Sequence, residues 1–199
     1  MSVFIKICGI TSAGDARQAV EAGADALGFN FFPRSPRYLE IEAVREIASK
    51  VPSNVAKVGV FVDSSAEQIA MAMRTAGLDI AQIHGPVPDG LNVRVWQALA
   101  AGSELRRSLE SSQAEAFLID TPADEQRGGT GRTFDWNLVA GLQARIVLAG
   151  GLGPDNVATA LRQVKPWGVD ACSRLESAPG RKDHAKVRAF IQAVRETGL

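Results

Sequence analysis

Short apolar runs alternate with segments whose apolar residues recur every three to four positions, and this alternation continues along the whole chain. The short runs have the length and composition of buried strands, whereas the periodic segments are typical of helices that bury one face. We expect strands at residues 3–8, 24–31, 56–62, 80–84, 93–98, 116–120, 145–149 and 168–173. We expect helices at residues 13–22, 41–51, 66–76, 99–113, 136–142, 154–164 and 183–197, of which 99–113 has the poorest apolar spacing.

Eight strands that alternate with helices predict a parallel sheet closed into a (β/α)8 TIM barrel. The 199 residues lie at the lower end of the range for this fold, so we expect one domain, residues 1–199, with short helices and connections on the bottom face. An open doubly wound sheet is the alternative. It is disfavoured because the glycine-rich turns lie late in the chain and not after the first strand.

Composition narrows the function classes. Lys plus Arg and Asp plus Glu both number 22, so no net charge favours nucleic acid or an anionic membrane as a partner. We find neither a secretory leader nor an apolar run long enough to span a bilayer, and therefore expect a cytoplasmic protein. Cys8 and Cys172 lie far apart without CxxC spacing, which argues against a structural zinc site or a disulfide scaffold.

The carboxyl ends of the strands are where a barrel of this type holds its active site. These positions form a polar set on otherwise apolar strands: Cys8, Asn30, Asp63, His84, Gln97, Asp120, Gly150, Gly151, Cys172, Ser173 and Arg174.

Cys8 ends the first strand and shares a strand face with Lys6. A thiol there could act as nucleophile, base or metal ligand, although a free cysteine is more often an inert buried group. To act as a base it must be a thiolate, which requires a nearby cation, and Lys6 is our candidate. The first and eighth strands become neighbours on closure, so we also predict an interior ion pair between Lys6 and Asp170.

Asp120 follows an apolar strand and precedes the long loop 121–133. Burial there would raise the pKa of the carboxyl group and favour its neutral, proton-donating form. A carboxylate that merely fixes the loop is the alternative. Gln82 and His84 alternate on the fourth strand and should face the barrel interior, where they either shape a pocket or form ordinary buried hydrogen bonds.

Glycine-rich segments at 128–131 and 150–153, with Cys172 and Ser173, fall in or beside the sixth to eighth βα loops. Loops after strands seven and eight form the usual phosphate site of this fold, so we expect a phosphorylated small-molecule substrate. Asn156 is positioned to cap the following helix.

An ordered set of motifs from residue 3 to about 193 resembles the phosphoribosylanthranilate isomerase family of tryptophan biosynthesis. The motifs are KICGIT at 6–11, GADALGF at 23–29, SPR at 35–37, VGVFV at 58–62, QIHG at 82–85, LIDT at 118–121, GGTG at 128–131, FDW at 134–136, AGGL at 149–152 and PGRKD at 179–183.

The resemblance implies an Amadori rearrangement of N-(5'-phosphoribosyl)anthranilate to 1-(2-carboxyphenylamino)-1-deoxyribulose 5-phosphate. It implies that Asp120 is the general acid, Cys8 the general base and Arg37 the residue that holds the anthranilate carboxylate. On composition alone Arg34 would serve as well as Arg37. The expected substrate-binding residues are Arg37, Gln82, His84, Gly129, Gly150, Gly151, Asp170, Ser173 and Arg174. We expect no metal or organic cofactor, because both steps are proton transfers. We also expect a monomer.

Two positions depart from the commoner family sequence, which has serine at 172 and glycine at 174. Arg174 replaces a conformationally free residue in the expected phosphate loop and adds a cation to it. Cys172 would lie beside Cys8, which suggests that an oxidant could link the two thiols and inactivate the enzyme.

Three other readings remain at this point. A related phosphoribosyl isomerase of histidine biosynthesis has a similar reaction but uses an aspartate where Cys8 stands. A Schiff-base aldolase would use Lys6, which lies deep in the predicted barrel. A non-catalytic barrel that binds a sugar phosphate is the third, since fold alone does not establish turnover.

Overall fold

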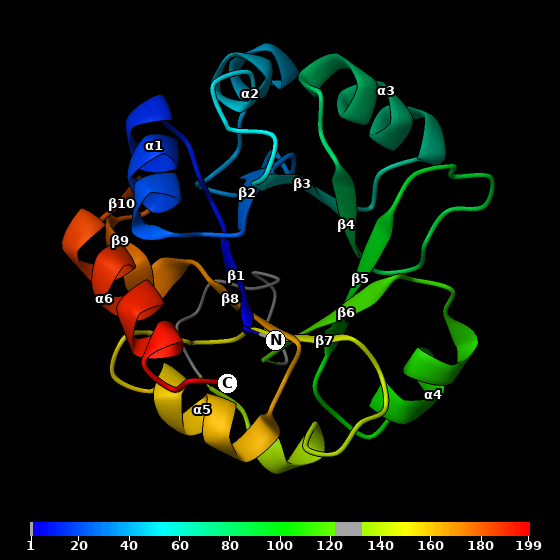
Figure 1. The fold of residues 1–199 in the computed structure, drawn as a ribbon. Coiled ribbons are helices and arrows are strands. Elements are labelled where there is room, and N and C mark those ends of the chain that lie inside the picture. The colour runs from blue at the N-terminus through cyan, green and yellow to red at the C-terminus, as the bar shows by residue number, and fades with distance from the viewer. Residues whose placement is uncertain (1, 122–132) are drawn as a thin grey trace.

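The chain forms a closed barrel of eight parallel strands in a computed structural model that describes residues 2–121 and 133–199. Each strand pairs with the next in sequence, and the first pairs with the eighth. Figure 1 looks along the barrel and shows the helices surrounding the strands. The predicted (β/α)8 fold is therefore confirmed. The barrel strands are β1 (Phe4–Ile7), β2 (Ala26–Asn30), β3 (Ala56–Val62), β4 (Ile80–His84), β5 (Val95–Ala100), β6 (Ala116–Asp120), β7 (Ile146–Leu148) and β8 (Gly168–Ala171).

Six α-helices of the described chain pack on the outside of the barrel. The connection between β4 and β5, residues 85–94, contains no helix and appears in Figure 1 as a long loop beside α3. The helices are α1 (Ala13–Ala22), α2 (Ile41–Ala48), α3 (Ala66–Ala76), α4 (Leu105–Ser111), α5 (Val157–Val164) and α6 (His184–Arg195). Two single 3-10 turns are η1 (Trp136–Leu138) and η2 (Ser173–Leu175).

Local capping chemistry sets several helix ends. Ser12 accepts a hydrogen bond from the backbone N–H of Asp15 at the start of α1, and Gly23 ends the helix in the left-handed conformation. Ser65 and Gln68 form a reciprocal capping box at the start of α3. These signals are visible in the sequence, which is why α1 and α3 have the predicted bounds.

Other bounds differ from the prediction. The segment expected as helix 99–113 begins as strand, because Leu99 and Ala100 pair with β6, and only Leu105–Ser111 is helical. The expected helix 136–142 is reduced to the turn η1, and α5 begins at Val157 instead of residue 154. A small antiparallel hairpin, β9 (Glu176–Ala178) and β10 (Arg181–Lys182), follows β8 and was not anticipated.

Strand alternation divides the core into two regions. Outward-facing side chains such as Ile5, Ile7 and Phe29 pack with the helices in the main hydrophobic cluster. Inside the barrel, Phe4, Trp96 and Trp167 pack against one another with ring centroids 4.6 to 5.8 Å apart. This aromatic cluster occupies the interior near the start of β1, so polar interior residues gather toward the carboxyl ends of the strands.

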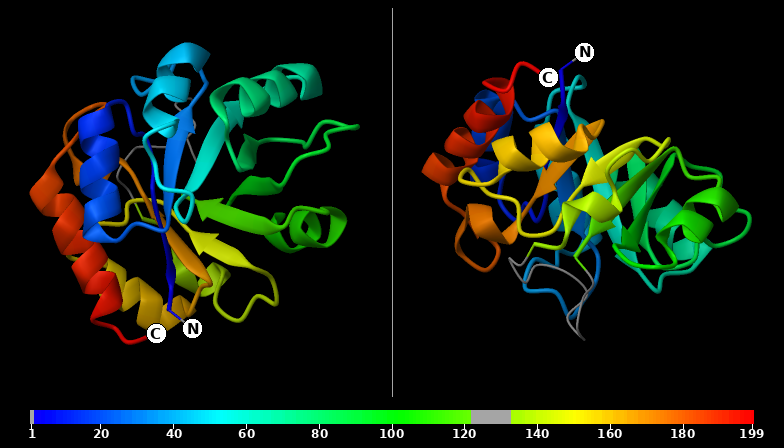
Figure 2. Two further views of the ribbon diagram at one scale, coloured as in Figure 1. Left: turned by 45° about the horizontal axis from the view of Figure 1, so that its top comes forward. Right: turned by 90° about the horizontal axis from the view of Figure 1, so that it is seen from below.

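Both termini lie at the opposite end of the barrel from these carboxyl ends. The backbone N–H of Val3 donates to the carbonyl of Leu199 at 3.2 Å, and the right-hand view of Figure 2 shows the two ends side by side. No helix of the described residues is long and apolar enough to cross a membrane.

Candidate active site

Cys8 follows β1 directly, on the barrel interior, and is 9% exposed. Its backbone N–H donates to the carbonyl of Ala171 at 3.0 Å, which fixes it at the junction of β1 and β8. Gly28 on the neighbouring strand leaves room for it, because a Cβ at Gly28 would lie 2.8 Å from the Cys8 sulphur. The thiol is thus held at the floor of the opening formed by the strand ends.

Lys6 and Asp170 form the predicted ion pair. The Lys6 Nζ lies 2.8 Å from Asp170 Oδ1, and the two side chains are 0% and 9% exposed. Burial, the largest single effect, would lower the pKa of Lys6, but the charges and hydrogen bonds of Asp170 and Cys8 together outweigh it and raise the pKa. Lys6 is therefore a buried cation, and a Schiff-base role, which needs a neutral amine, does not fit it.

The Cys8 thiol is activated by its neighbours. A hydrogen bond with Cys172 makes the largest contribution, burial opposes it, and the charge of Lys6 assists, which together lower the pKa of Cys8 to about 7. The predicted influence of Lys6 is confirmed, but it is the second favourable cause. The first, the Cys172 thiol, was not anticipated.

Asp120 ends β6 and faces the same interior. Burial raises its pKa to about 6, against a smaller opposing effect of the hydrogen bond from the backbone N–H of Thr121 at 2.7 Å. The charges of Asp170 and Lys6 also act on it. The expected raised pKa is confirmed, and the bond to Thr121 shows that Asp120 also orders the start of its loop.

Gln82 and His84 face the interior from β4, as predicted. The Gln82 Nε2 lies 3.2 Å from the His84 Nε2, and Gln82 is 2% exposed. Among the described residues the Gln82 Oε1 has no hydrogen-bond partner. The two side chains therefore order each other, and the buried Gln82 Oε1 remains an acceptor without a partner among the described residues.

Two other strand-end positions make hydrogen bonds within their own loops. Gln97 lies on the outer face of β5, where it donates to the carbonyl of Gly85 at 3.0 Å and borders a cavity of about 720 Å³ beside α4. The interior positions of β5 are Trp96 and Ala98. Asn30 accepts from the backbone N–H of Phe32 at 2.8 Å and so orders the β2–α2 loop.

Arg37 reaches the site from this loop, but its guanidinium is already paired. It donates to both Glu176 oxygens at 2.7 and 2.8 Å. Lys182, whose side chain is fully buried, donates to Glu176 at 3.0 Å and to the Cys172 carbonyl at 3.2 Å. Burial would raise the pKa of Glu176, but the bonds from Arg37 and Lys182 hold it below its usual range. The Arg37 side chain is 12% exposed, so its orientation is set by this carboxylate.

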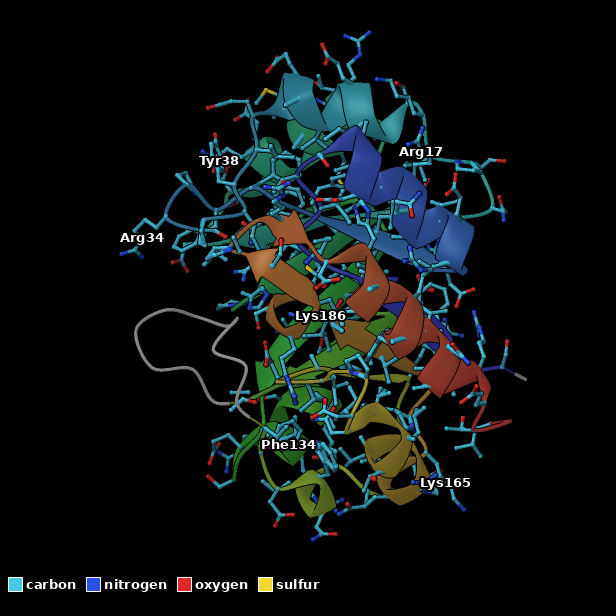
Figure 3. All side chains as sticks on the ribbon, turned by 90° about the vertical axis from the view of Figure 1, so that its left-hand side faces the viewer. Arg17, Arg34, Tyr38, Phe134, Lys165 and Lys186 are labelled. Carbon is cyan, nitrogen blue, oxygen red and sulfur yellow. The ribbon has the colours of Figure 1, made fainter. Side chains whose placement is uncertain are left out.

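Arg34 and Arg37 are distinguished by the structure. Arg34 is exposed and lies over the Phe32 ring at 4.9 Å. Figure 3 shows Arg34 projecting from the loop away from the barrel. Arg37 is therefore the arginine of this loop that is turned toward the site.

The expected phosphate loops lie at the carboxyl ends of β7 and β8. Gly150 and Gly151 have φ of 82° and 61°, and a Cβ at Gly150 would lie 2.7 Å from the Thr121 nitrogen. Asn156 occupies the N-cap position before α5, as expected, but its side chain makes no capping hydrogen bond. Its side chain joins the loop instead, with bonds to the Gly153 N–H at 2.8 Å and the Gly151 carbonyl at 2.9 Å.

Arg174 stands in η2 and braces the two loops. It donates to the Gly151 carbonyl at 3.1 Å and to both Asp155 oxygens at 2.7 and 2.9 Å. Its φ is not in the left-handed region, so glycine is not required at this position. Ser173 lies beside it in the same turn. Gly129 and the 128–131 segment lie outside the described residues.

Residues 5–193 match the family model described as N-(5'phosphoribosyl)anthranilate (PRA) isomerase. The chain belongs to this family. A PRA isomerase of Solibacter usitatus is 44% identical over 197 residues, which cover 97% of this chain and 98% of that one.

Solved structures of the PRA isomerase family have the same fold. The enzyme from Thermotoga maritima has a TM-score of 0.90 at 39% identity, with 99% of this chain and 100% of that one covered. A PRA isomerase in complex with reduced 1-(o-carboxyphenylamino)-1-deoxyribulose 5-phosphate has a TM-score of 0.84 at 36% identity, with coverage of 99% and 100%.

Three features of this PRA isomerase site were missed from the sequence: the Cys172 hydrogen bond, Glu176 and Lys182. Lys182 lies in the PGRKD motif, and Glu176 follows the 172–174 departure, so both were in view without an assigned role. Their contacts arise because the β9–β10 hairpin folds back over the end of β8. Within residues 2–121 and 133–199, no group of three or more His, Cys, Asp or Glu side chains could hold a metal ion.

Replacing Lys6 with methionine should destabilise the protein by about 3–5 kcal/mol, because Asp170 would remain buried without its partner. It should also raise the pKa of Cys8 by removing a favourable charge. Urea unfolding measures the first effect. Arg17→Met is the matched control, since Arg17 pairs with Glu21 on the surface at 3.8 Å and should matter by less than about 0.5 kcal/mol. Equal stability of the two variants would contradict the buried pair.

Proposed function

We propose that this chain catalyses the Amadori rearrangement of N-(5'-phosphoribosyl)anthranilate in tryptophan biosynthesis, with Cys8 as general base and Asp120 as general acid. One observation carries the assignment. A thiol whose pKa is lowered to about 7 and a carboxyl whose pKa is raised to about 6 face the same barrel interior, and Lys6 and Asp170 act on both. Family membership supports the substrate.

The chemistry needs one proton donor and one proton acceptor. Asp120 in its neutral form gives a proton to the furanose ring oxygen, the C1'–O bond breaks, and the ring opens to a protonated Schiff base. The Cys8 thiolate then removes the C2' proton, which leaves an enolamine. Tautomerisation of the enolamine gives the aminoketose. The whole sequence consists of proton transfers and bond rearrangement, with no net oxidation or reduction of the substrate.

This division of roles sets the pH dependence. Only the form with a Cys8 thiolate and a protonated Asp120 is active, and the pKa values of about 7 and about 6 make it a minority form. We expect a bell-shaped profile of kcat/KM with its maximum between these two values. The acidic limb reflects protonation of Cys8 and the alkaline limb reflects ionisation of Asp120.

Initial rates measured from about pH 5 to about pH 9 test this expectation. A profile that stays flat from neutrality to the alkaline end would contradict Asp120 as the acid. Unfolding curves at the same pH values separate loss of structure from loss of the active protonation state.

For the substrate carboxylate we propose Arg37. A guanidinium offers two parallel donors to a planar carboxylate, and Glu176 holds this one in place. Exchange of one oxygen contact from Glu176 to the substrate would keep the arginine paired throughout, while Lys182 continues to compensate Glu176.

Arg37→Lys should raise KM at least about tenfold with a smaller change in kcat, because a point charge replaces a bidentate fork worth about 1.5–3 kcal/mol. Arg34→Lys is the matched control on the same loop and should leave KM unchanged, since Arg34 is exposed and stacked on Phe32. Similar KM values for the two variants would contradict the assignment of Arg37 to the binding site.

The phosphate is assigned to the loops after β6, β7 and β8. Gly129, Gly150, Gly151 and Ser173 supply backbone or hydroxyl donors in this proposal, and α5 begins nearby. Arg174 contributes through its bracing of the loops, because its donors are engaged by Asp155 and Gly151. Gln82, His84 and Asp170 line the interior below the sugar.

Turnover of freshly generated phosphoribosylanthranilate, followed by loss of its anthranilate-type fluorescence, tests the proposed function. Product formation in a wild-type reaction would support it. Binding of the reduced product analogue without turnover would instead indicate a non-catalytic sugar-phosphate protein. Activity only on the related histidine-pathway substrate would indicate the other isomerase.

We further propose that the chain acts as a single-domain cytoplasmic monomer. Large exposed apolar side chains among the described residues are Met71, Leu138 and Leu199, which lie in separate elements and form no continuous patch. A Thermotoga maritima relative is described as dimeric, so light scattering of this protein is the necessary test.

A further inference from the structure

Cys8 and Cys172 stand opposite each other where the barrel closes. Ile7 pairs with Ala171 in the β1–β8 ladder, so the next residue on each strand is a cysteine. Neighbouring strands lie about 4.8 Å apart, which falls within the Cα separation of about 4.4–6.8 Å that a disulfide requires. Both thiols are free in this structure.

The two thiols interact. A hydrogen bond between their side chains lowers the pKa of Cys8 and raises that of Cys172, as expected when a Cys172 S–H donates to a Cys8 thiolate. The Cys172 sulphur also lies 3.9 Å from Glu176 Oε1. Gly9 keeps the space beside them open, because a Cβ there would lie 2.8 Å from the Cys172 sulphur. The strand register and this open space place the two thiols side by side.

We propose that Cys8 and Cys172 form a redox modification site at which a hydroperoxide closes a reversible disulfide and switches the isomerase off. Cys8 is the residue attacked by the oxidant, and Cys172 is the resolving residue. The bond would consume the proposed general base, and reduction by a dithiol would restore it. Formation of the disulfide depends on the geometry of the two thiols, whereas the loss of isomerase activity rests on the proposed role of Cys8.

The reaction balances in two steps. The Cys8 thiolate attacks the terminal peroxide oxygen, the O–O bond breaks, and water or an alcohol leaves, so that Cys8 becomes a sulfenic acid. The Cys172 sulphur then attacks the Cys8 sulphur, the S–O bond breaks, and water leaves with the Cys172 proton. The two thiols supply two electrons, which reduce the peroxide.

The surroundings favour this order of events. The hydrogen bond from Cys172 to Cys8, together with burial, raises the pKa of Cys172, so Cys172 begins as the neutral thiol. Conversion of Cys8 to a neutral sulfenic acid removes the negative charge that opposes ionisation of Cys172. The buried Lys182 ammonium, 3.8 Å from the Cys172 sulphur, and the Arg37 guanidinium then favour its thiolate.

Hydrogen peroxide treatment of the whole protein, with intact mass and activity measured in parallel, tests the proposal. We expect the intact mass to fall by two hydrogen atoms. Tryptic digestion should give the peptides 7–17 and 163–174 linked to each other, and reduction should separate them. Dithiothreitol should restore activity. A gain of two oxygen atoms on Cys8 with no linked peptides would overturn the proposal. So would a disulfide formed only between two chains.

Cys172→Ser is the control, because it keeps a hydroxyl donor beside Cys8 but has no second sulphur. Prolonged exposure should carry Cys8 in this variant to the sulfinic acid, which dithiothreitol does not reverse, whereas the wild type remains recoverable. Each protein is compared with its own untreated activity. Equal irreversible loss in both would contradict a resolving role for Cys172. The mass readout does not depend on turnover, so it separates failure of this proposal from failure of the proposed isomerase function.

Discussion

Asp120→Asn is expected to lower kcat by about 10²–10⁴-fold, the usual contribution of a positioned proton donor, and at the same time to make the protein more stable. An asparagine keeps an oxygen that can accept from the Thr121 N–H but has no proton to give to the ring oxygen. A carboxylate that served only to order the loop would behave differently, because its loss would leave catalysis largely intact.

The stability gain follows from the raised pKa. Asp120 has a folded pKa of about 6 against its ordinary value of 3.8, so the folded state holds this proton more tightly than the unfolded chain does. Stability from this proton is fully present below the unfolded value and is lost as the pH rises through about 6. At neutral pH the buried charge then costs up to about 3 kcal/mol, which asparagine avoids.

Unfolding by urea at several pH values measures this difference, with Asp89→Asn in the exposed β4–β5 loop as the control. The advantage of Asp120→Asn over the wild type should grow between about pH 4 and about pH 6 and then level off. Asp89→Asn should follow the wild type throughout. An Asp120→Asn protein that is less stable at neutral pH would mean that the carboxylate is stabilised, not strained, by its site.

Cys8→Ser is expected to lower kcat by a similar factor with KM little changed, because a serine hydroxyl is not ionised at neutral pH and cannot accept the C2' proton. The thiol has room for this exchange, since serine is smaller than cysteine and Gly28 already leaves space around it. The defect should therefore be chemical and not structural.

Alkylation by iodoacetamide provides an independent measure of the same group. In the wild type, the alkylation rate of Cys8 should rise with a midpoint at about pH 7, and isomerase activity should be lost in parallel. The reduced product analogue should protect the thiol. Full activity after complete alkylation of Cys8 would exclude it as the base.

Local sequence signals predicted those parts of the fold that are set locally. β3, α3, β4 and β6 have the expected bounds, because each is a compact apolar run or a helix with its own capping residues. The predicted bounds are wrong where pairing with a distant strand determines the secondary structure. β5 continues to Ala100 because β6 offers it partners, and the β9–β10 hairpin forms where no apolar pattern marks a strand.

The same division holds for the site. Cys8, Asp120 and the Lys6–Asp170 pair could be predicted, because strand alternation and barrel closure fix them on one interior face. Gln97 was misplaced, since the interior positions of β5 are the apolar Trp96 and Ala98. The partners of Arg37 depend on where a loop far along the chain returns, which no local pattern reveals.

The most direct test of Cys8 and Asp120 as the base and acid compares the wild type, Cys8→Ser and Asp120→Asn in one fluorescence assay with freshly generated phosphoribosylanthranilate. Binding of the reduced product analogue is measured on the same samples. We predict turnover by the wild type alone and binding by all three proteins. Turnover at the wild-type rate by either variant would contradict the account and move that proton transfer to another residue.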